Sequence, residues 1–145
     1  MVSEVLSGGA DISTLSDMEY FGRKEGCKGV QICTRKNEDL HIGEAKLERI
    51  EYYFWRGKFC SAWVFVKDPL DFLDLKNAVF EKFGKGYQDN KDIEYYVWHG
   101  SIASTSLKYN KISGEGYLLM FSMEIYKQME SYHKQKAKEG AETGF

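Results

Sequence analysis

A chain of 145 residues, 43% hydrophobic, 15% aromatic and 29% charged, has the length and the apolar content of one folded domain. Its net charge of −2 gives no bulk attraction for nucleic acid or an anionic membrane surface, so neither partner is expected. No run approaches the about 20 consecutive apolar residues of a membrane-spanning helix, so no membrane span is expected.

The start of the chain and the cysteines bear on the cellular compartment. Residues 1–13 lack the basic start and the apolar run of a signal peptide, which favours the cytoplasm. A leader removed beforehand would instead place the chain in the periplasm or the envelope. Cys27, Cys33 and Cys60 include no close CxxC pair, which favours a reduced chain over one disulfide with a leftover thiol.

The first third of the chain predicts short, interrupted elements. Residues 1–20 look irregular, with a short helical turn capped by Asp11 or Ser13, and the glycines of residues 22–29 indicate a loop. The alternation over residues 30–35 predicts a strand, and a polar turn follows. A short strand at residues 40–42 ends at Gly43.

Residues 47–66, LERIEYYFWRGKFCSAWVFV, predict a long aromatic β-hairpin with its turn near Arg56 and Gly57. The two-residue period of a strand puts even-numbered residues 50–54 on one face and odd-numbered residues 51–55 on the other. After the turn, the odd-numbered residues from Phe59 to Phe65 alternate in the same way with the even-numbered ones.

The strongest helix prediction covers residues 69–83. Asp68 is a suitable N-cap, Pro69 fits the first helical position, and Gly84 is a natural C-cap. The apolar residues recur at helical spacing and form one wide stripe: Phe72, Leu73, Leu75, Val79, Phe80 and Phe83.

The last third predicts three strands and a helix. Strands are expected at residues 93–99 and 102–109, and the nearly continuous apolar run at 117–123 is typical of a central strand covered on both faces. Residues 124–138 predict an amphipathic helix. Residues 1–138 would then form a single domain, and residues 139–145 a flexible tail.

Two similar heptapeptides, EYYFWRG at residues 51–57 and EYYVWHG at residues 94–100, are identical at five of seven positions. The repeat indicates a duplicated hairpin-plus-helix unit, although a sheet of aromatic strands produces such likenesses by itself. In either case the predicted fold class is α+β: an antiparallel sheet of five to seven strands with two helices on one face.

Familiar nucleotide-binding motifs are incomplete in this chain. Residues 22–28 have one residue too few between the glycines for a phosphate-binding loop and lack the Lys-Ser/Thr that should follow. The stretch RGKFCSAWV departs from the RNA-binding strand signature because Lys58 stands where the first aromatic residue belongs.

Catalytic and metal-binding patterns are also weak. His41, His99 and His133 are predicted on separate elements without cysteine or carboxylate at ligand spacing, so no metal site and no cofactor is expected. Cys60 and His99 each flank a glycine turn, which leaves a thiol–imidazole pair as a third, weaker hypothesis. No catalytic residue is otherwise predicted.

The aromatic residues carry the functional prediction. Ten Tyr, nine Phe and three Trp exceed what a core of this size needs, so some rings should lie on the second face of the sheet. The predicted ligand-binding residues are Tyr53, Trp55, Tyr96, Trp98 and His99. If another segment covers these rings, they are core residues instead.

The spacing of structural glycines and aromatic residues resembles that of a group of small bacterial proteins of uncharacterised function. The likeness covers roughly residues 12–126 and lies in Ile42-Gly43, Ala45, Leu47, Ile50, Tyr52, Phe54, Gly57-Lys58-Phe59, Leu75 to Phe83-Gly84, Tyr96-x-Trp98-x-Gly100, Leu107-x-Tyr109 and Gly116-x-Leu118. Many such proteins are exported or lipid-anchored, and the resemblance implies an envelope location. Their opening aromatic-Gly strand is reduced here to Ser7-Gly8-Gly9, and they bring no known activity or catalytic residues.

Two interpretations of function follow. The first is a non-enzymatic binding or assembly module that uses the aromatic sheet face, with a homodimer covering the rings of each subunit. The second is a small-molecule-binding protein with a Tyr- and Trp-lined pocket between sheet and helix.

Overall fold

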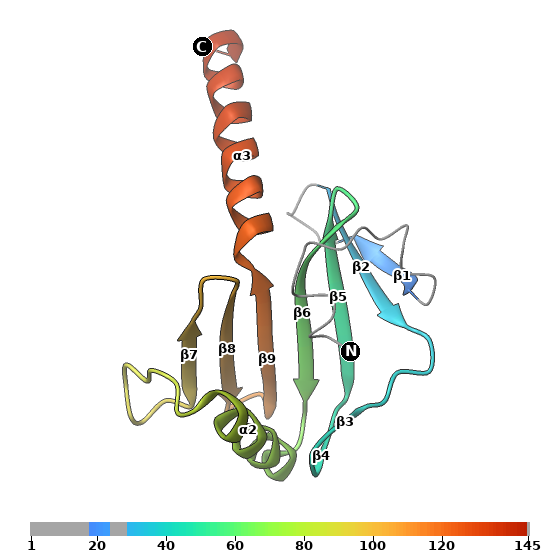
Figure 1. Cartoon of the computed structure of the whole chain (residues 1–145), viewed down its shortest axis with the longest axis vertical. Coiled ribbons are helices and arrows are strands. Elements are labelled where there is room, and N and C mark those ends of the chain that lie inside the picture. Colours follow the sequence, from blue (N-terminus) through green and yellow to red (C-terminus); the bar gives the residue numbers. More distant parts are fainter. Residues whose placement is uncertain (1–17, 24–28, 145) are drawn as a thin grey trace.

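The computed structural model of the chain describes residues 18–23 and 29–144. The turn predicted at Asp11 or Ser13 and the segment around Ser7 lie outside these residues. The described residues form a seven-stranded antiparallel sheet, in the order β1-β2-β5-β6-β9-β8-β7, and two helices (Figure 1). The predicted α+β class is therefore confirmed.

The strand bounds follow the predicted alternation closely after residue 30. The strands are β1 (Met18–Arg23), β2 (Val30–Arg35), β5 (Arg49–Trp55), β6 (Lys58–Val66), β7 (Tyr95–His99), β8 (Ala103–Asn110) and β9 (Glu115–Ser122). A separate small hairpin consists of β3 (His41–Ile42) and β4 (Ala45–Lys46). Strand β1 was not predicted, because its sequence MEYFGR lacks the clean alternation of the later strands.

Helix α2 (Pro69–Phe83) has the predicted bounds and caps. The Asp68 side chain accepts a hydrogen bond from the Leu70 N–H at 2.8 Å, and the N–H of Gly84 donates to the Phe80 carbonyl at 2.8 Å. Gly84 has φ of 78°, in the left-handed region that glycine adopts without a steric penalty. The helix lies across one end of the strands in Figure 1.

The main hydrophobic core lies between α2 and the sheet face that we call the α2 face. Phe72, Leu75 and Val79 of α2 are buried there. The sheet contributes alternate residues of β5, β6, β8 and β9 to this core: Ile50, Tyr52, Phe54, Ala62, Val64, Val66, Leu107, Leu118 and Met120. Phe59 is fully buried on the same face, next to Phe54 at 5.8 Å between ring centroids.

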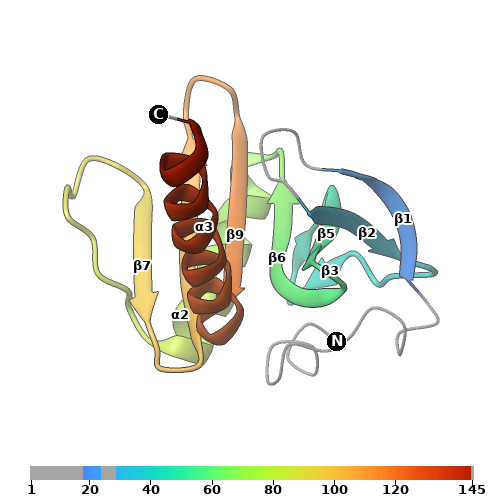
Figure 2. The same ribbon diagram turned by 90° about the horizontal axis from the view of Figure 1, so that it is seen from above.

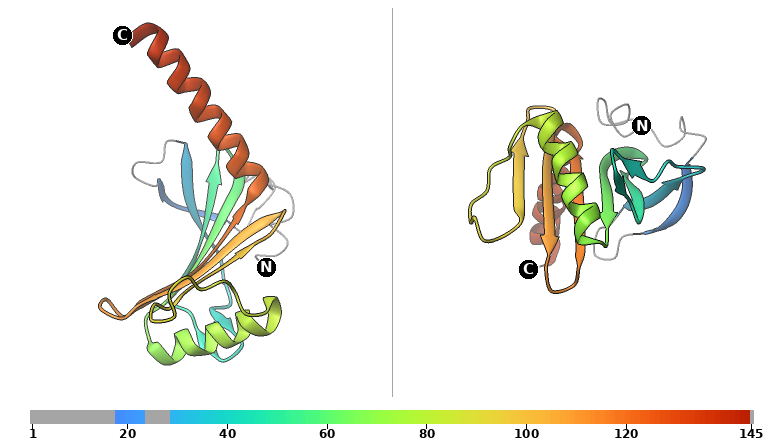
Figure 3. Two further views of the ribbon diagram at one scale, coloured as in Figure 1. Left: turned by 90° about the vertical axis from the view of Figure 1, so that its left-hand side faces the viewer. Right: turned by 90° about the horizontal axis from the view of Figure 1, so that it is seen from below.

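Helix α3 (Met123–Gly144) follows β9 directly and packs on the opposite face, which we call the α3 face. Its first turn is capped by Ser122, whose hydroxyl accepts from the Ile125 N–H at 3.3 Å. Ile125, Met129 and Tyr132 pack against Val30, Tyr53 and Trp55 of the sheet in a second, smaller cluster. Residues 133–144 are exposed and extend beyond the end of the strands (Figures 1 and 3).

Two details of the predicted arrangement differ from the structure. The helices lie on opposite faces of the sheet rather than on one face, because Ile125 packs with Tyr53 whereas Leu75 packs with Tyr52 and Phe54. Helix α3 also continues past residue 138 to Gly144, where the Thr143 hydroxyl donates to the Glu139 carbonyl at 3.0 Å. A single glycine such as Gly140 costs a helix about 1 kcal/mol and need not end it.

The two EYYxWxG segments occupy different places in the sheet. The first lies largely in β5, an inner strand between β2 and β6, whereas the second lies largely in β7 at an edge (Figure 2). The first is followed by one strand and a helix, the second by two strands and a helix. The equivalent residues Tyr53 and Tyr96 also face opposite sides, so these segments are not matching parts of a duplicated hairpin.

Tyr52 provides a pH-dependent contribution to stability. Its side chain is fully buried and its hydroxyl donates to the Glu38 carboxylate. Burial, followed by this hydrogen bond and the negative charge of Glu38, raises the pKa of Tyr52 above its ordinary value. An unfolded chain loses this proton near pH 10 while the folded chain retains it, so alkaline pH favours unfolding.

We therefore expect the free energy of unfolding to fall as pH rises above about 10, and Tyr52→Phe to reduce that slope. Urea unfolding followed by circular dichroism between pH 8 and pH 11 would measure both slopes. Equal slopes for the two proteins would contradict the assignment to Tyr52.

Candidate functional site

The five predicted ligand-binding residues do not form one site. Tyr53 and Trp55 lie in the small cluster on the α3 face, whereas Tyr96 and Trp98 pack against the main core on the α2 face. The sheet register explains the division. Tyr53 pairs with Ser61, which faces α3, whereas Tyr96 pairs with Leu107 of the main core.

His99 shares the α3 face with Tyr53 but lies far along the sheet. The paired residues run from Tyr53 through Ser61, Phe121 and Ser104 to His99, which spans four strand spacings. At about 4.8 Å per spacing the two residues are about 19 Å apart. Cys60, next to Ser61 on β6, is about 14 Å from His99 by the same spacing, so the predicted thiol–imidazole pair is not brought together.

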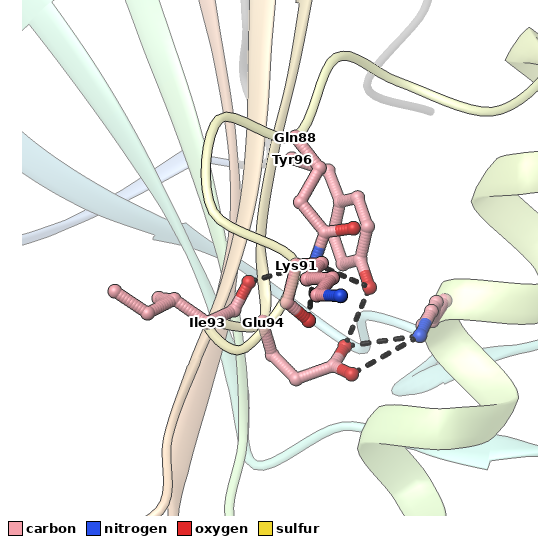
Figure 4. A network of polar contacts seen from close by, with 6 residues as sticks. Gln88, Lys91, Ile93, Glu94 and Tyr96 are labelled. Atoms are coloured by element: carbon pink, nitrogen blue, oxygen red, sulfur yellow. Dashed lines mark hydrogen bonds and ion pairs between the residues drawn. The ribbon is translucent and has the colours of Figure 1, made fainter.

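Tyr96 takes part in a polar network that connects α2 to the segment before β7 (Figure 4). The Tyr96 hydroxyl donates to Glu94 at 3.0 Å, and Lys76 of α2 forms an ion pair with the same carboxylate at 3.0 Å. Gln88 donates to the Ile93 carbonyl at 2.8 Å. Burial alone would lower the pKa of Lys76, but the hydrogen bonds to Tyr96 and Glu94 raise it above its usual range. The lysine is therefore held as a cation in a structural contact.

Trp98 contacts the segment that follows α2, at Gly84 and Gly86. Its indole N–H donates to the Gly84 carbonyl at 3.0 Å, and a Cβ on Gly86 would lie 2.7 Å from the Trp98 ring. Tyr87 exchanges two backbone hydrogen bonds with Val97 along the outer side of β7. Trp98 and Tyr96 thus hold a segment that covers an edge strand, which protects the edge from pairing with other chains.

An open pocket of about 180 Å³ lies on the α3 face, between the sheet and the first two turns of α3. Most of its lining side chains are aromatic or aliphatic, and the others carry a thiol or a hydroxyl group. The lining residues are Val30, Tyr53, Cys60, Ser61, Trp63, Leu119, Phe121, Ser122, Tyr126 and Met129. Of the five residues predicted from sequence, Tyr53 alone is among them.

A stack of planar side chains continues from the pocket along β6. Tyr53 and Trp63 have ring centroids 5.9 Å apart, Trp63 and Phe65 stack at 5.9 Å with an interplanar angle of 8°, and the Arg49 guanidinium lies 3.9 Å over Phe65. A buried carboxylate, Glu51, is 6% exposed and holds both ends of this stack. It accepts from the Arg49 Nε at 3.1 Å and from the Tyr53 hydroxyl at 3.3 Å.

This arrangement has the properties of a binding surface whose rings are fixed in advance. Burying a carboxylate is costly unless it is paired and hydrogen-bonded, and Glu51 has both kinds of partner. Its two contacts restrict Tyr53 and Arg49, and the stacked rings between them restrict one another. Binding of a ligand to these rings would therefore cost little side-chain entropy of the protein.

The pocket offers few groups for proton transfer or metal binding. The lining residues that belong to the described part of the chain include no Asp, Glu, His, Lys or Arg. Across residues 18–23 and 29–144, no cluster of three or more His, Cys, Asp or Glu could hold a metal ion. Within the same residues, neither helix has the length and apolar character needed to cross a membrane.

Comparison with known proteins adds no assignment, because no family model, curated protein or solved structure matches this chain. The resemblance to small bacterial proteins therefore stays a prediction from the sequence.

Nine of the ten lining residues that the structure describes were not among the predicted ligand-binding residues, and Ser61, Trp63 and Leu119 show why. The alternation over β6 places Ser61 and Trp63 on one face, but it does not show that this face is shared with Tyr53. That pairing depends on an irregularity in the β5–β6 register between Tyr53 and Phe54. Leu119 belonged to a strand that was predicted to be covered on both faces, whereas its side chain is only half-buried.

Proposed function

We propose that the protein is a non-enzymatic binding protein that holds a small apolar ligand in the pocket between α3 and the sheet. The observation that carries the proposal is the pocket itself, which has a ring-lined wall, a volume of about 180 Å³ and an opening to solvent. Ligand sites are concave and mostly apolar, with a small number of polar groups that fix orientation. Ser61 and Ser122 supply such groups here.

A non-enzymatic role is favoured by the chemistry of the walls. General acid–base catalysis needs a titratable side chain within hydrogen-bonding reach of the reacting atom. The wall residues that the structure describes supply hydroxyl groups and the thiol of Cys60 but no carboxylate, imidazole or amine. The serine hydroxyls therefore have no activating base in the lining.

A probe of the right size and polarity would test this proposal. We expect 4-fluorotoluene to bind the wild-type protein and to show a broadened ¹⁹F resonance. Leu119→Trp should weaken binding at least about tenfold, or about 1.4 kcal/mol, because the larger ring would occupy the pocket. Ile112→Trp is the matched control, since Ile112 is 99% exposed in the loop between β8 and β9. An unbroadened signal, or equal binding by both variants, would contradict the proposal.

Self-association is the second candidate, and one specific observation favours it. Trp63, Phe65 and Tyr117 form a strip of half-buried rings beside the pocket, with Trp63 and Tyr117 centroids 5.2 Å apart. A second copy of the chain could cover this strip, as the sequence interpretation expects for a homodimer.

Sedimentation velocity at micromolar concentration would measure the association. A dimer is expected for the wild type and a monomer for the Phe65→Ser, Tyr117→Ser double variant. The Ile102→Ser, Ile112→Ser double variant changes two exposed apolar residues elsewhere and should remain dimeric. A monomeric wild type would exclude this candidate and leave the ligand-binding proposal in place.

A further inference from the structure

The absence of charge on the pocket walls restricts the ligand. A charged group taken from water into an apolar site needs an ionic or strongly hydrogen-bonded partner, because without one it loses its hydration and gains nothing in exchange. Among residues 18–23 and 29–144, the lining contains no ionisable side chain other than the Cys60 thiol and the tyrosine hydroxyls. The nearby carboxylate of Glu51 is already paired with Arg49 and Tyr53. The part of a ligand that enters the pocket should therefore be uncharged.

The volume restricts the ligand further. Pockets for drug-sized molecules measure about 300–1,000 Å³, whereas an engineered apolar cavity of about 150 Å³ binds benzene. A pocket of about 180 Å³ therefore matches one ring with a small substituent.

The walls favour an aromatic ring over an aliphatic one. Tyr53 and Trp63 form one pair of rings at 5.9 Å and 33°, and Phe121 and Tyr126 form another at 5.6 Å and 48°. Tilted and edge-to-face arrangements at such separations are the favourable ones between aromatic groups. All four rings line the pocket, so an aromatic ring inside it would meet aromatic partners.

One hydroxyl on the wall is suited to orient that ring. Ser122 already accepts from the backbone N–H of Ile125 at 3.3 Å. Ser61 is only 8% exposed, and the contact of its Oγ is a long one, 3.8 Å to Sγ of Cys60. A thiol is a weak hydrogen-bonding group, so Ser61 would gain by exchanging it for an oxygen or nitrogen of a ligand.

We infer that the pocket selects an uncharged compound with one aromatic ring and one hydroxyl or N–H group, of the phenol class, with Ser61 as its hydrogen-bonding partner. This inference rests on the proposed binding function and specifies its ligand. Ser61 is the specificity residue, and the ring pairs of Tyr53 with Trp63 and of Phe121 with Tyr126 supply the contact area.

Four probes of similar size and two serine variants test the inference by NMR chemical-shift titration. The probes are p-cresol, toluene, benzoate and benzylamine at pH 7. We expect p-cresol and toluene to bind and the two charged probes to bind at least about tenfold more weakly. Ser61→Ala should weaken p-cresol about threefold to tenfold, since a neutral hydrogen bond contributes about 0.5–1.5 kcal/mol. Toluene binding should stay within about twofold, which also shows that the variant is folded.

Ser104→Ala is the matched control. Ser104 is likewise 8% exposed and pairs with Phe121 on the same face, but it does not line the pocket. It should leave the binding of both neutral probes unchanged. Tight binding of benzoate or benzylamine would overturn the inference that the ligand is uncharged, and an equal response of p-cresol and toluene to Ser61→Ala would overturn the role of Ser61. Failure of all four probes would instead overturn the proposed function.

Discussion

Leu75→Ala is expected to lower the free energy of unfolding by about 2–5 kcal/mol, the largest effect that we predict for a change in α2. Leu75 is fully buried between α2 and the sheet, in the cluster that contains Val64 and Leu118. Truncation removes its apolar contacts and leaves a cavity that the strands, held by hydrogen bonds on both sides, close only in part. Urea unfolding monitored by circular dichroism would measure the loss.

Leu73→Ala, in the same helix, is the matched control for that experiment. Leu73 is 47% exposed, so the same change in side chain and helix propensity should cost less than about 1 kcal/mol. The difference between the two variants isolates burial from propensity. Equal losses would mean that α2 contributes little through its packed face.

The same pair of residues shows what helical spacing can predict. The apolar stripe, the Asp68 cap, Pro69 and Gly84 fix the bounds of α2 because each acts within a few residues along the chain. Spacing assigned both Leu73 and Leu75 to one wide stripe, but the sheet beneath α2 covers only its centre, which includes Phe72, Leu75 and Val79. The width of the covered stripe depends on the partner surface, which helical spacing does not contain.

The β5–β6 hairpin shows where strand alternation stops being sufficient. The turn has positive φ at both Arg56 and Gly57, as expected for a tight hairpin turn, and it pairs Trp55 with Lys58. A shift in register then pairs Phe54 with Phe59 but Tyr53 with Ser61, so Cys60 is an extra residue on β6. Phe59 consequently faces α2 with Phe54, whereas Ser61, Trp63 and Phe65 face the other side.

This bulge decides which residues form the pocket. Strict alternation puts Phe59, Ser61 and Trp63 on one face, and a slip of one residue moves every later side chain to the other face relative to the turn. Tyr53 could be predicted as a site residue because the chain has more aromatic residues than its core needs, so some rings were expected on the second face of the sheet. Its neighbours Ser61 and Leu119 could not, because their positions depend on the bulge and on the β6–β9 pairing.

The repeated heptapeptide misled the site prediction for a related reason. Similar short sequences such as EYYFW and EYYVW report strand propensity, which Tyr, Trp, Phe and Val share. Propensity does not fix which face a side chain occupies. Tyr53 faces α3 from an inner strand, and Tyr96 faces α2 from an edge strand. Trp98 and Tyr96 are instead used to hold the segment that covers that edge.

Gly116→Ala is the second substitution with a large expected effect, because Phe72 of α2 packs directly against Gly116 of β9. A Cβ at this position would lie 2.8 Å from Cδ2 of Phe72 and 3.0 Å from Cγ2 of Val66. Phe72 is itself buried and stacks on Tyr109 at 4.9 Å, so its ring has little freedom to move away. Overpacking of this kind costs about 1–3 kcal/mol.

A smaller opposing effect comes from the unfolded chain, since alanine loses less backbone entropy than glycine by about 0.5–1 kcal/mol. The steric term is the larger of the two, and we expect Gly116→Ala to be less stable than wild type in urea unfolding. Gly140→Ala in α3 is the control, because its added Cβ would meet no atom within 4 Å beyond the adjacent residues and backbone of its own helix, and it should be neutral or stabilising. Phe72→Leu tests the cause. If the ring is the obstacle, the destabilisation caused by Gly116→Ala should be smaller in the Phe72→Leu background, and an unchanged loss would place the clash elsewhere.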